Sequence, residues 1–233
     1  MADQQLLMQA ASWTPEQKAL YTEVARVVVA RSPRGRRIVA VDGRDGAGKT
    51  HLADALHVAF ARAGVQSFRA SLDDFHQSRE RRYRQGRDSW KGYYEDAFDL
   101  ELVDRVLLQP FRMGGSTGFM TRAFDVETDQ AVEMDWQTAG PDAVLIVDGV
   151  FLLRPAFRGR WHVVVRLEAS DAERGARLQR RDGAHPLVTD PSHDRYRLAH
   201  EHYERLADPI AKADMVVDTT DWRAPRQVFQ DRC

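Results

Sequence analysis

Short runs of apolar and β-branched residues recur along the chain, and few of them alternate apolar with polar positions. The five runs are "RRIVAVD" (36–42), "VQSFRASL" (65–72), "AVLIVDG" (143–149), "WHVVVRLEA" (161–169) and "ADMVVDT" (213–219). Continuous apolar runs of this length are typical of strands that are covered on both faces, as in a parallel sheet flanked by helices. The pattern therefore predicts five buried strands.

The segments between these runs carry apolar residues at helical spacing. Residues 14–31 begin with "TPEQ", in which Thr14 and Gln17 can form a capping box around a proline at the first helical position. Residues 49–62 carry an apolar stripe that stops before Gly64. Further helices are predicted over residues 99–111, with Asp99 as the N-cap, from about residue 171 and from about residue 193.

Strands that alternate with helices predict an α/β fold, a three-layer α/β/α sandwich around a mostly parallel sheet. Glycines precede "FMTRAFDVETDQAVEMDW", which predicts a small β-hairpin within residues 114–136. A stretch that contains two prolines, residues 182–193, is expected to form a lid loop. We expect a single domain over residues 1–233, with residues 1–36 as an N-terminal helical extension.

Composition narrows the class of protein. Of the 233 residues, 43% are hydrophobic, which is enough for one sizeable core. The 34 basic and 35 acidic residues give a net charge of -1, which argues against a dedicated nucleic-acid-binding protein. No stretch resembles a membrane span or a signal peptide, so we expect a cytoplasmic protein without membrane or nucleic-acid partners. The single cysteine, Cys233, excludes an internal disulfide.

A phosphate-binding motif follows the first predicted strand. Residues 43–50 read "GRDGAGKT" and match the Walker A pattern G-x-x-x-x-G-K-T, with an amphipathic helix after it. Glycines let the backbone curl so that consecutive N–H groups point at phosphate oxygens, at the positive end of the helix. We expect the phosphates of ATP to be bound by Gly43, Asp45, Gly46, Ala47, Gly48, Lys49, Thr50 and His51, with Lys49 also acting in catalysis.

A metal site is predicted beside this motif. The Thr50 hydroxyl suits a Mg²⁺ ligand, and Asp148 ends the strand "VLIVDG" as a Walker B carboxylate does. Asp-Gly is also a common turn pair, but the Walker A motif favours the metal-binding interpretation. The expected cofactors are therefore ATP and Mg²⁺.

The segment "SLDDFH" (71–76) ends the second predicted strand. Ligands bind at the carboxyl ends of the strands in open α/β sheets, and a carboxylate there could accept the proton of an attacking hydroxyl. Either Asp73 or Asp74 could serve. Because adjacent strand residues point to opposite faces, we expect only one of them to do so.

Together these segments resemble the uridine kinase, phosphoribulokinase and pantothenate kinase family of P-loop kinases. The similarity runs from about residue 37 to residue 218 and includes actinobacterial uridine kinase-like proteins. It rests on "VDGRDGAGKT", "SLDDFH", "EDAFD" (95–99), "VLIVDG" and "RLQRRD" (177–182) near "ADMVVD".

The resemblance implies a P-loop NTPase fold and ATP-dependent phosphorylation of a hydroxyl group on a small molecule. It places Asp73 as the catalytic base. It also places Arg177, Arg180 and Arg181 beside a lid over ATP, where Arg177 and Arg181 are expected to be catalytic and Arg180 to contact the nucleotide.

Two positions depart from the pattern of uridine kinases. Tyr93 stands where they carry an acidic residue for the ribose, and Asp129 lies near the position of a histidine that reads the pyrimidine. An Arg- and Tyr-rich stretch over residues 79–94 could clamp an anionic or aromatic acceptor, or could be a solvated loop. Acceptor contacts are predicted from Asp73, Arg79, Tyr83, Tyr93, Tyr94, Arg122 and Phe124. We predict that uridine is a poor substrate and that a hydroxyl compound with an anionic group is better.

Three other functions fit parts of the sequence. A nucleoside kinase proper is the simplest outcome of the resemblance, and a nucleoside monophosphate kinase would share the lid but needs no base. A non-catalytic nucleotide-binding module or switch would not require Lys49, Asp73 and Asp148 together, and the guanine-reading N-K-x-D motif is absent. We therefore predict an ATP:alcohol phosphotransferase, monomeric or homodimeric.

Overall fold

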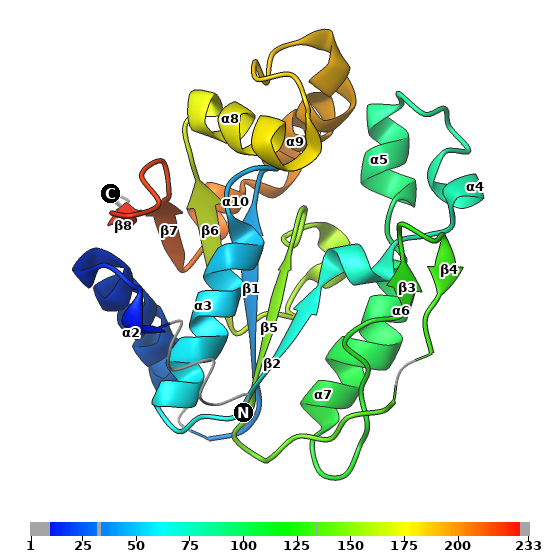
Figure 1. Ribbon diagram of the computed structural model, residues 1–233. Helices are drawn as coiled ribbons and strands as arrows, with labels where there is room; N and C mark the ends of the chain where they lie inside the picture. The colour runs from blue at the N-terminus through cyan, green and yellow to red at the C-terminus, as the bar shows by residue number, and fades with distance from the viewer. Residues whose placement is uncertain (1–9, 32–33, 134, 229–233) are drawn as a thin grey trace.

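The computed structural model describes residues 10–31, 34–133 and 135–228. Its centre is a six-stranded sheet in the order β2-β5-β1-β6-β7-β8 (Figure 1). The strands are β1 (Arg37–Gly43), β2 (Ser67–Ser71), β5 (Val144–Gly149), β6 (Val163–Glu168), β7 (Met215–Asp218) and β8 (Arg226–Val228). The first five pair in parallel and β8 is antiparallel to β7, which confirms the predicted mostly parallel sheet.

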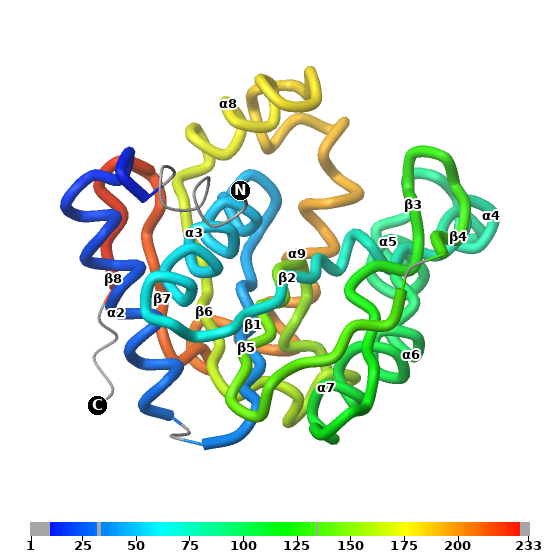
Figure 2. The backbone as a smooth tube through the Cα atoms, turned by 60° about the horizontal axis from the view of Figure 1, so that its bottom comes forward, coloured from blue at the N-terminus to red at the C-terminus, as the bar shows by residue number. Residues whose placement is uncertain are grey.

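Helices cover both faces of this sheet (Figures 1 and 2). Val39 and Val41 of β1 pack against the side that carries α2 (Pro15–Arg31) and α3 (Lys49–Arg62). Ile38 and Ala40, which point to the opposite face, belong to a second cluster with residues of α5, α9 and the helical segment between residues 100 and 113. The predicted three-layer α/β/α sandwich is therefore confirmed. The bounds on this second face are α5 (Trp90–Asp96), α6 (Leu100–Val103), a π-helical turn (Asp104–Leu108), α7 (Gln109–Met113) and α9 (Asp194–Ala207).

Capping interactions begin the helices where the sequence predicts them. The Thr14 N–H donates to Gln17 Oε1 at 2.9 Å, and the Gln17 N–H donates to Thr14 Oγ1 at 3.2 Å, which completes the capping box of α2. Asp99 Oδ1 accepts from the Leu102 N–H at 2.9 Å and caps α6.

The hairpin lies beyond the sheet, beside α4 (Arg79–Arg82) and α5 (Figure 2). Its strands β3 (Phe124–Asp125) and β4 (Gln130–Ala131) have two residues each and fall within the predicted range. Asp129, at φ 58°, accepts from the Arg79 N–H at 2.8 Å and from Arg82 Nη2 at 3.1 Å. These bonds fasten the hairpin to α4.

The segment predicted as a lid loop folds back on α8 (Asp171–Asp182), beyond the carboxyl ends of the strands (Figure 1). It ends in a 3₁₀ turn (Pro191–His193), and His193 Nε2 lies 2.7 Å from the carbonyl oxygen of His185. A Cβ atom added at Gly175 would lie only 1.8 Å from the Pro186 carbonyl oxygen. The backbone of the loop therefore rests directly on a glycine of α8. The remaining short elements are two 3₁₀ turns (Leu72–Phe75 and Pro155–Phe157) and α10 (Pro209–Lys212).

Gly175→Ala is expected to lift the loop from α8, because the added methyl group would overlap with backbone that cannot rotate away. Amide hydrogen exchange over residues 184–190 should become faster, and the free energy of unfolding should fall by about 1–3 kcal/mol, the usual effect of overpacking. Gln179→Ala, at an exposed position of the same helix, is the matched control. Unchanged exchange in the glycine variant would contradict this packing.

Each helix in the described part of the chain is too short or too polar to span a lipid bilayer.

Candidate active site

The carboxyl ends of β1 and β5 and the loop 43–50 surround a cavity of about 340 Å³. Gly46 and Gly48 adopt φ values of 77° and 89°, which are accessible to glycine without strain and let the loop curl into α3. Gly43 is packed so closely that an added Cβ would lie 2.9 Å from the carbonyl oxygen of Leu167 on β6. The cavity is lined by Asp45, Gly46, Gly48, Lys49, Thr50, His51, Asp54, Asp73, Asp148, Val150, Arg177, Leu178 and Arg181.

The predicted metal ligands meet in this cavity. The Thr50 hydroxyl donates to Asp148 Oδ2 at 2.8 Å, so that two hard oxygen donors lie side by side. This is the donor type that Mg²⁺ takes together with phosphate oxygens, so these residues fit the cation. The sequence analysis missed Arg69 of β2, whose Nη1 donates to Asp148 Oδ1 at 2.8 Å and holds the carboxylate from its other side. Its only sequence signal is a charged residue inside an apolar run. β2 lies at the edge of the sheet, and its residues other than Ala70 are half-buried rather than buried as predicted.

The two carboxylates of the 71–76 segment are separated, but not by the strand alternation that the sequence analysis assumed, because β2 ends at Ser71 and both residues lie in the 3₁₀ turn Leu72–Phe75. Asp73 lines the cavity with Lys49, whereas Asp74 forms an ion pair with Arg122 (Oδ1 to Nε, 3.1 Å). The Asp73 side chain is exposed to the open cleft. Partial desolvation by the surrounding protein raises its pKa, although His76 and Lys49 oppose this. His76 Nδ1 lies 2.8 Å from the Asp73 carbonyl oxygen, and burial lowers the pKa of His76. A carboxylate with a raised pKa in a cleft is suited to proton transfer.

The arginines of α8 occupy different positions. Arg177 donates from Nη1 to the Gly46 carbonyl at 3.2 Å and from Nη2 to the Thr219 carbonyl at 2.6 Å, so it ties the phosphate loop to the end of β7. Arg181 lines the cavity and pairs with the neighbouring Asp182. Arg180 is exposed and lies 3.4 Å from a Glu173 oxygen. The hydrogen bond to Asp182 raises the pKa of Arg181, and the charges of Asp45 and Asp73 raise it further.

An aromatic residue that the sequence analysis missed flanks the phosphate loop. The Trp222 ring lies edge-on to His51, with centroids 4.3 Å apart, and a Cβ at Gly48 would lie 3.4 Å from it. Burial lowers the pKa of His51, which favours the neutral ring.

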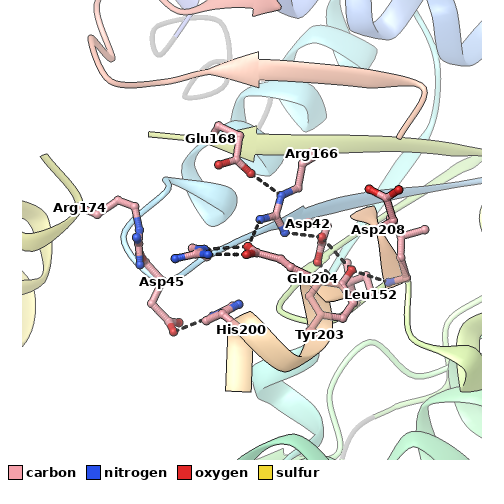
Figure 3. A network of polar contacts seen from close by, with 12 residues as sticks. Asp42, Asp45, Leu152, Arg166, Glu168, Arg174, His200, Tyr203, Glu204 and Asp208 are labelled. Atoms are coloured by element: carbon pink, nitrogen blue, oxygen red, sulfur yellow. Dashed lines mark hydrogen bonds and ion pairs between the residues drawn. The ribbon is translucent and has the colours of Figure 1, made fainter. Parts of the chain in front are cut away.

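A buried ionic network lies beneath the phosphate loop (Figure 3). The guanidinium group of Arg166, which is 0% exposed, contacts Asp42 Oδ2 at 2.8 Å, Glu168 Oε1 at 2.7 Å and Glu204 Oε1 at 3.1 Å. Tyr203 donates its hydroxyl to Asp42 at 3.0 Å, and Glu204 also pairs with Arg44. The network fixes the loop to α9.

Asp42→Ala is expected to lower the free energy of unfolding by about 3–5 kcal/mol, because it leaves the buried charge of Arg166 with less compensation. Urea denaturation would measure the change. Glu23→Ala removes the exposed Glu23–Arg26 pair (2.7 Å) and should change stability by no more than about 1 kcal/mol. Similar losses in both variants would contradict a structural role for the network.

Asp45 links the cavity to α9. Its Oδ2 lies 3.2 Å from Nε2 of His200, whose Nδ1 has no hydrogen-bond partner among the described residues. Burial lowers the pKa of His200, which keeps the ring neutral and donating to Asp45. Although burial alone would raise the pKa of Asp45, the His200 hydrogen bond and the charge of Lys49 hold it well below its usual range.

The residues predicted to contact an acceptor divide into two groups. Tyr93 is buried beside Tyr196, with ring centroids 4.9 Å apart. Burial raises the pKa of Tyr93, and the charges of Asp45 and Asp73 raise it further. Tyr94 belongs to the same core cluster as Tyr93, and its ring packs on Phe151 and His202 rather than on Tyr196. The other predicted contacts are placed as follows: Tyr83 half-buried, Arg79 exposed, Arg122 paired with Asp74 and Asp125, and Phe124 half-buried on β3.

A family model for the IstB-like ATP binding protein matches residues 32–130. No curated protein sequence matches the chain at a significant level.

Solved structures of kinases superpose on most of the chain. A possible uridine kinase from Bacillus stearothermophilus has a TM-score of 0.68 and 24% identity, covering 84% of this chain and 96% of its own. A candidate fructose transport system kinase from Silicibacter sp. TM1040 has a TM-score of 0.65 and 25% identity, with 80% and 95% covered. A D-glycerate 3-kinase from Cryptococcus neoformans has a TM-score of 0.53 and 13% identity, with 90% and 99% covered. The chain therefore has the fold of P-loop kinases.

Proposed function

We propose that this protein transfers a phosphoryl group from ATP to a hydroxyl group of a small molecule. The observation that carries the proposal is the position of Asp73, a carboxylate with a raised pKa in the same cavity as Lys49, Thr50 and Asp148. A phosphate grip, metal-binding oxygens and a proton acceptor in one cavity are the groups that transfer to an alcohol needs.

Each group has a separate task in this reaction. The loop amides and Lys49 bind the phosphates of ATP, and Thr50 and Asp148 would hold Mg²⁺, which neutralises charge on the phosphate oxygens when bound. Asp73 accepts the proton of the attacking hydroxyl. Arg181 stabilises the charge on the transferring group, while Arg177, bound to the Gly46 carbonyl, keeps the loop in shape.

The alternative functions explain fewer of these observations. A nucleoside monophosphate kinase transfers to a phosphate and has no use for a base at Asp73. A uridine kinase needs groups that read the ribose and the pyrimidine, but Tyr93 is a buried phenol and Asp129 is taken up by Arg82 and the Arg79 N–H. A non-catalytic module would not need Lys49, Asp73 and Asp148 in one cavity. The cytoplasmic location and the monomeric or dimeric state stay predictions.

An ATP-consumption screen tests the proposal. Nucleosides, sugars, hydroxy acids and pantothenate-like alcohols would each be offered with ATP and Mg²⁺, and the product would be identified by mass spectrometry. At least one hydroxyl compound is expected to be phosphorylated in a reaction that Lys49→Ala abolishes. ATP hydrolysis alone, or transfer only to nucleoside monophosphates, would contradict the proposal.

A further inference from the structure

Three arginines around the acceptor side of Asp73 are neutralised by the protein itself. Arg82 pairs with Asp129 at 3.1 Å, and Arg84 pairs with Asp96 at 2.5 Å. Arg122 lies between two carboxylates, Asp74 and Asp125. These arginines, which the sequence suggested for an anionic substrate, are therefore engaged in holding α4, α5 and the hairpin in place.

Arg195 of α9 differs from them. Its guanidinium carbon lies over the rings of Tyr83, Tyr93 and Tyr196, at 4.8, 5.3 and 5.8 Å from their centroids. We call this group the tyrosine cage. Nη1 donates to the Arg87 carbonyl at 2.5 Å, and Nε is buried without a hydrogen-bond partner. Within the described residues, no carboxylate forms an ion pair with this guanidinium.

The tyrosine cage adjoins the catalytic carboxylate. His76 Nδ1 lies 2.8 Å from the Asp73 carbonyl oxygen, and the His76 ring packs on Phe98 with centroids 4.6 Å apart. The Phe98 ring in turn lies 6.2 Å from that of Tyr93, so the cage is joined to the Asp73 segment through Phe98. The pKa of His76, the residue hydrogen-bonded to the Asp73 carbonyl, is lowered mainly by burial. The charges of Arg82 and Arg195 lower it further. Arg195 therefore lies on the acceptor side of Asp73.

We propose that Arg195 binds an anionic group, a carboxylate or a phosphate, of the acceptor whose hydroxyl faces Asp73. This inference rests on the proposed function of the same site. Aromatic faces stabilise the cation and fix the plane of the guanidinium fork, so little freedom is lost when the fork binds two anionic oxygens. A neutral acceptor would leave this half-buried cation without a counter-charge.

Matched pairs of acceptors test the inference. D-glycerate would be compared with glycerol for the carboxylate arm, and ribose 5-phosphate with ribose for the phosphate arm. We expect kcat/KM for one anionic member to exceed that of its neutral partner by about 10- to 100-fold, the usual contribution of a hydrogen-bonded charge pair. Arg195→Gln should remove most of this preference by raising KM for the anion, with kcat and the neutral compound little affected.

Two further variants separate recognition from structural support. Arg195→Lys keeps the charge but not the fork, so it should retain part of the preference. Arg205→Gln, at an exposed position of α9, should leave the preference unchanged. Equal or better transfer to the neutral members by the wild type would overturn the inference while the proposed function stands. Equal losses for both members in Arg195→Gln would show a structural strut, and no Lys49-dependent transfer to any compound would overturn both.

Discussion

Lys49→Ala is expected to lower kcat/KM for phosphoryl transfer by about 10³- to 10⁵-fold, the range in which groups that neutralise the transferring phosphoryl group contribute. The half-buried lysine faces the cavity, and its Nζ donates to the Arg44 carbonyl at 3.1 Å. The ammonium group has three N–H donors, so after this hydrogen bond two remain for the phosphates of ATP. Steady-state kinetics with the acceptor found in the screen, and binding of a non-hydrolysable ATP analogue, would measure the loss.

The fold should survive this substitution, because the lysine does not belong to either apolar cluster of the core. Thermal unfolding of the variant should match that of the wild type. Lys91→Ala removes an exposed lysine that lies 3.9 Å from a Glu95 oxygen and should change neither activity nor stability. Normal turnover by Lys49→Ala would show that loop 43–50 is not the phosphate grip.

The elements that could be predicted from the sequence are those with a local signal. The five parallel strands follow from apolar runs, and the capping residues Thr14 and Asp99 follow from side-chain chemistry within three residues of their partners. Strand β8 has no such signal, because its three residues are Arg226, Gln227 and Val228 and it exists through pairing with β7. Edge strands of this kind depend on tertiary context.

The acceptor side shows the same division between local and long-range signals. Tyr93 and Tyr94 are both aromatic and adjacent, so the sequence suggested them together. In a helix, however, adjacent side chains point about 100° apart, and only Tyr93 reaches the cage. Arg195 lies 108 positions from its hydrogen-bond partner Arg87, and no pattern in the chain joins them. Arg69 and Arg166 likewise acquire their carboxylates only once the sheet forms.

Asp73→Asn is expected to lower kcat by about 10²- to 10⁴-fold, because the amide keeps the shape of the side chain but cannot accept the proton of the hydroxyl. Affinity for ATP should barely change, since the phosphates are held by loop 43–50 rather than by this residue. Asp74→Asn is the matched control one residue away. Its carboxylate pairs with Arg122 outside the cavity lining, so we expect a loss of a few-fold at most. If Asp74→Asn proved the crippling substitution, the base would be misassigned by one residue.

The pH dependence gives an independent readout of the same carboxyl group. The pKa of Asp73 is raised by desolvation, so its proton-accepting form is lost, as pH falls, at a higher pH than for an ordinary aspartate. The acid limb of kcat/KM for the wild type should therefore lie above the usual range of aspartate, because this profile reports groups of the free enzyme. Asp73→Asn has no carboxyl to protonate, so its residual activity should lack that limb. A limb that persists unchanged in the variant would assign the titrating group, and the base, to another residue.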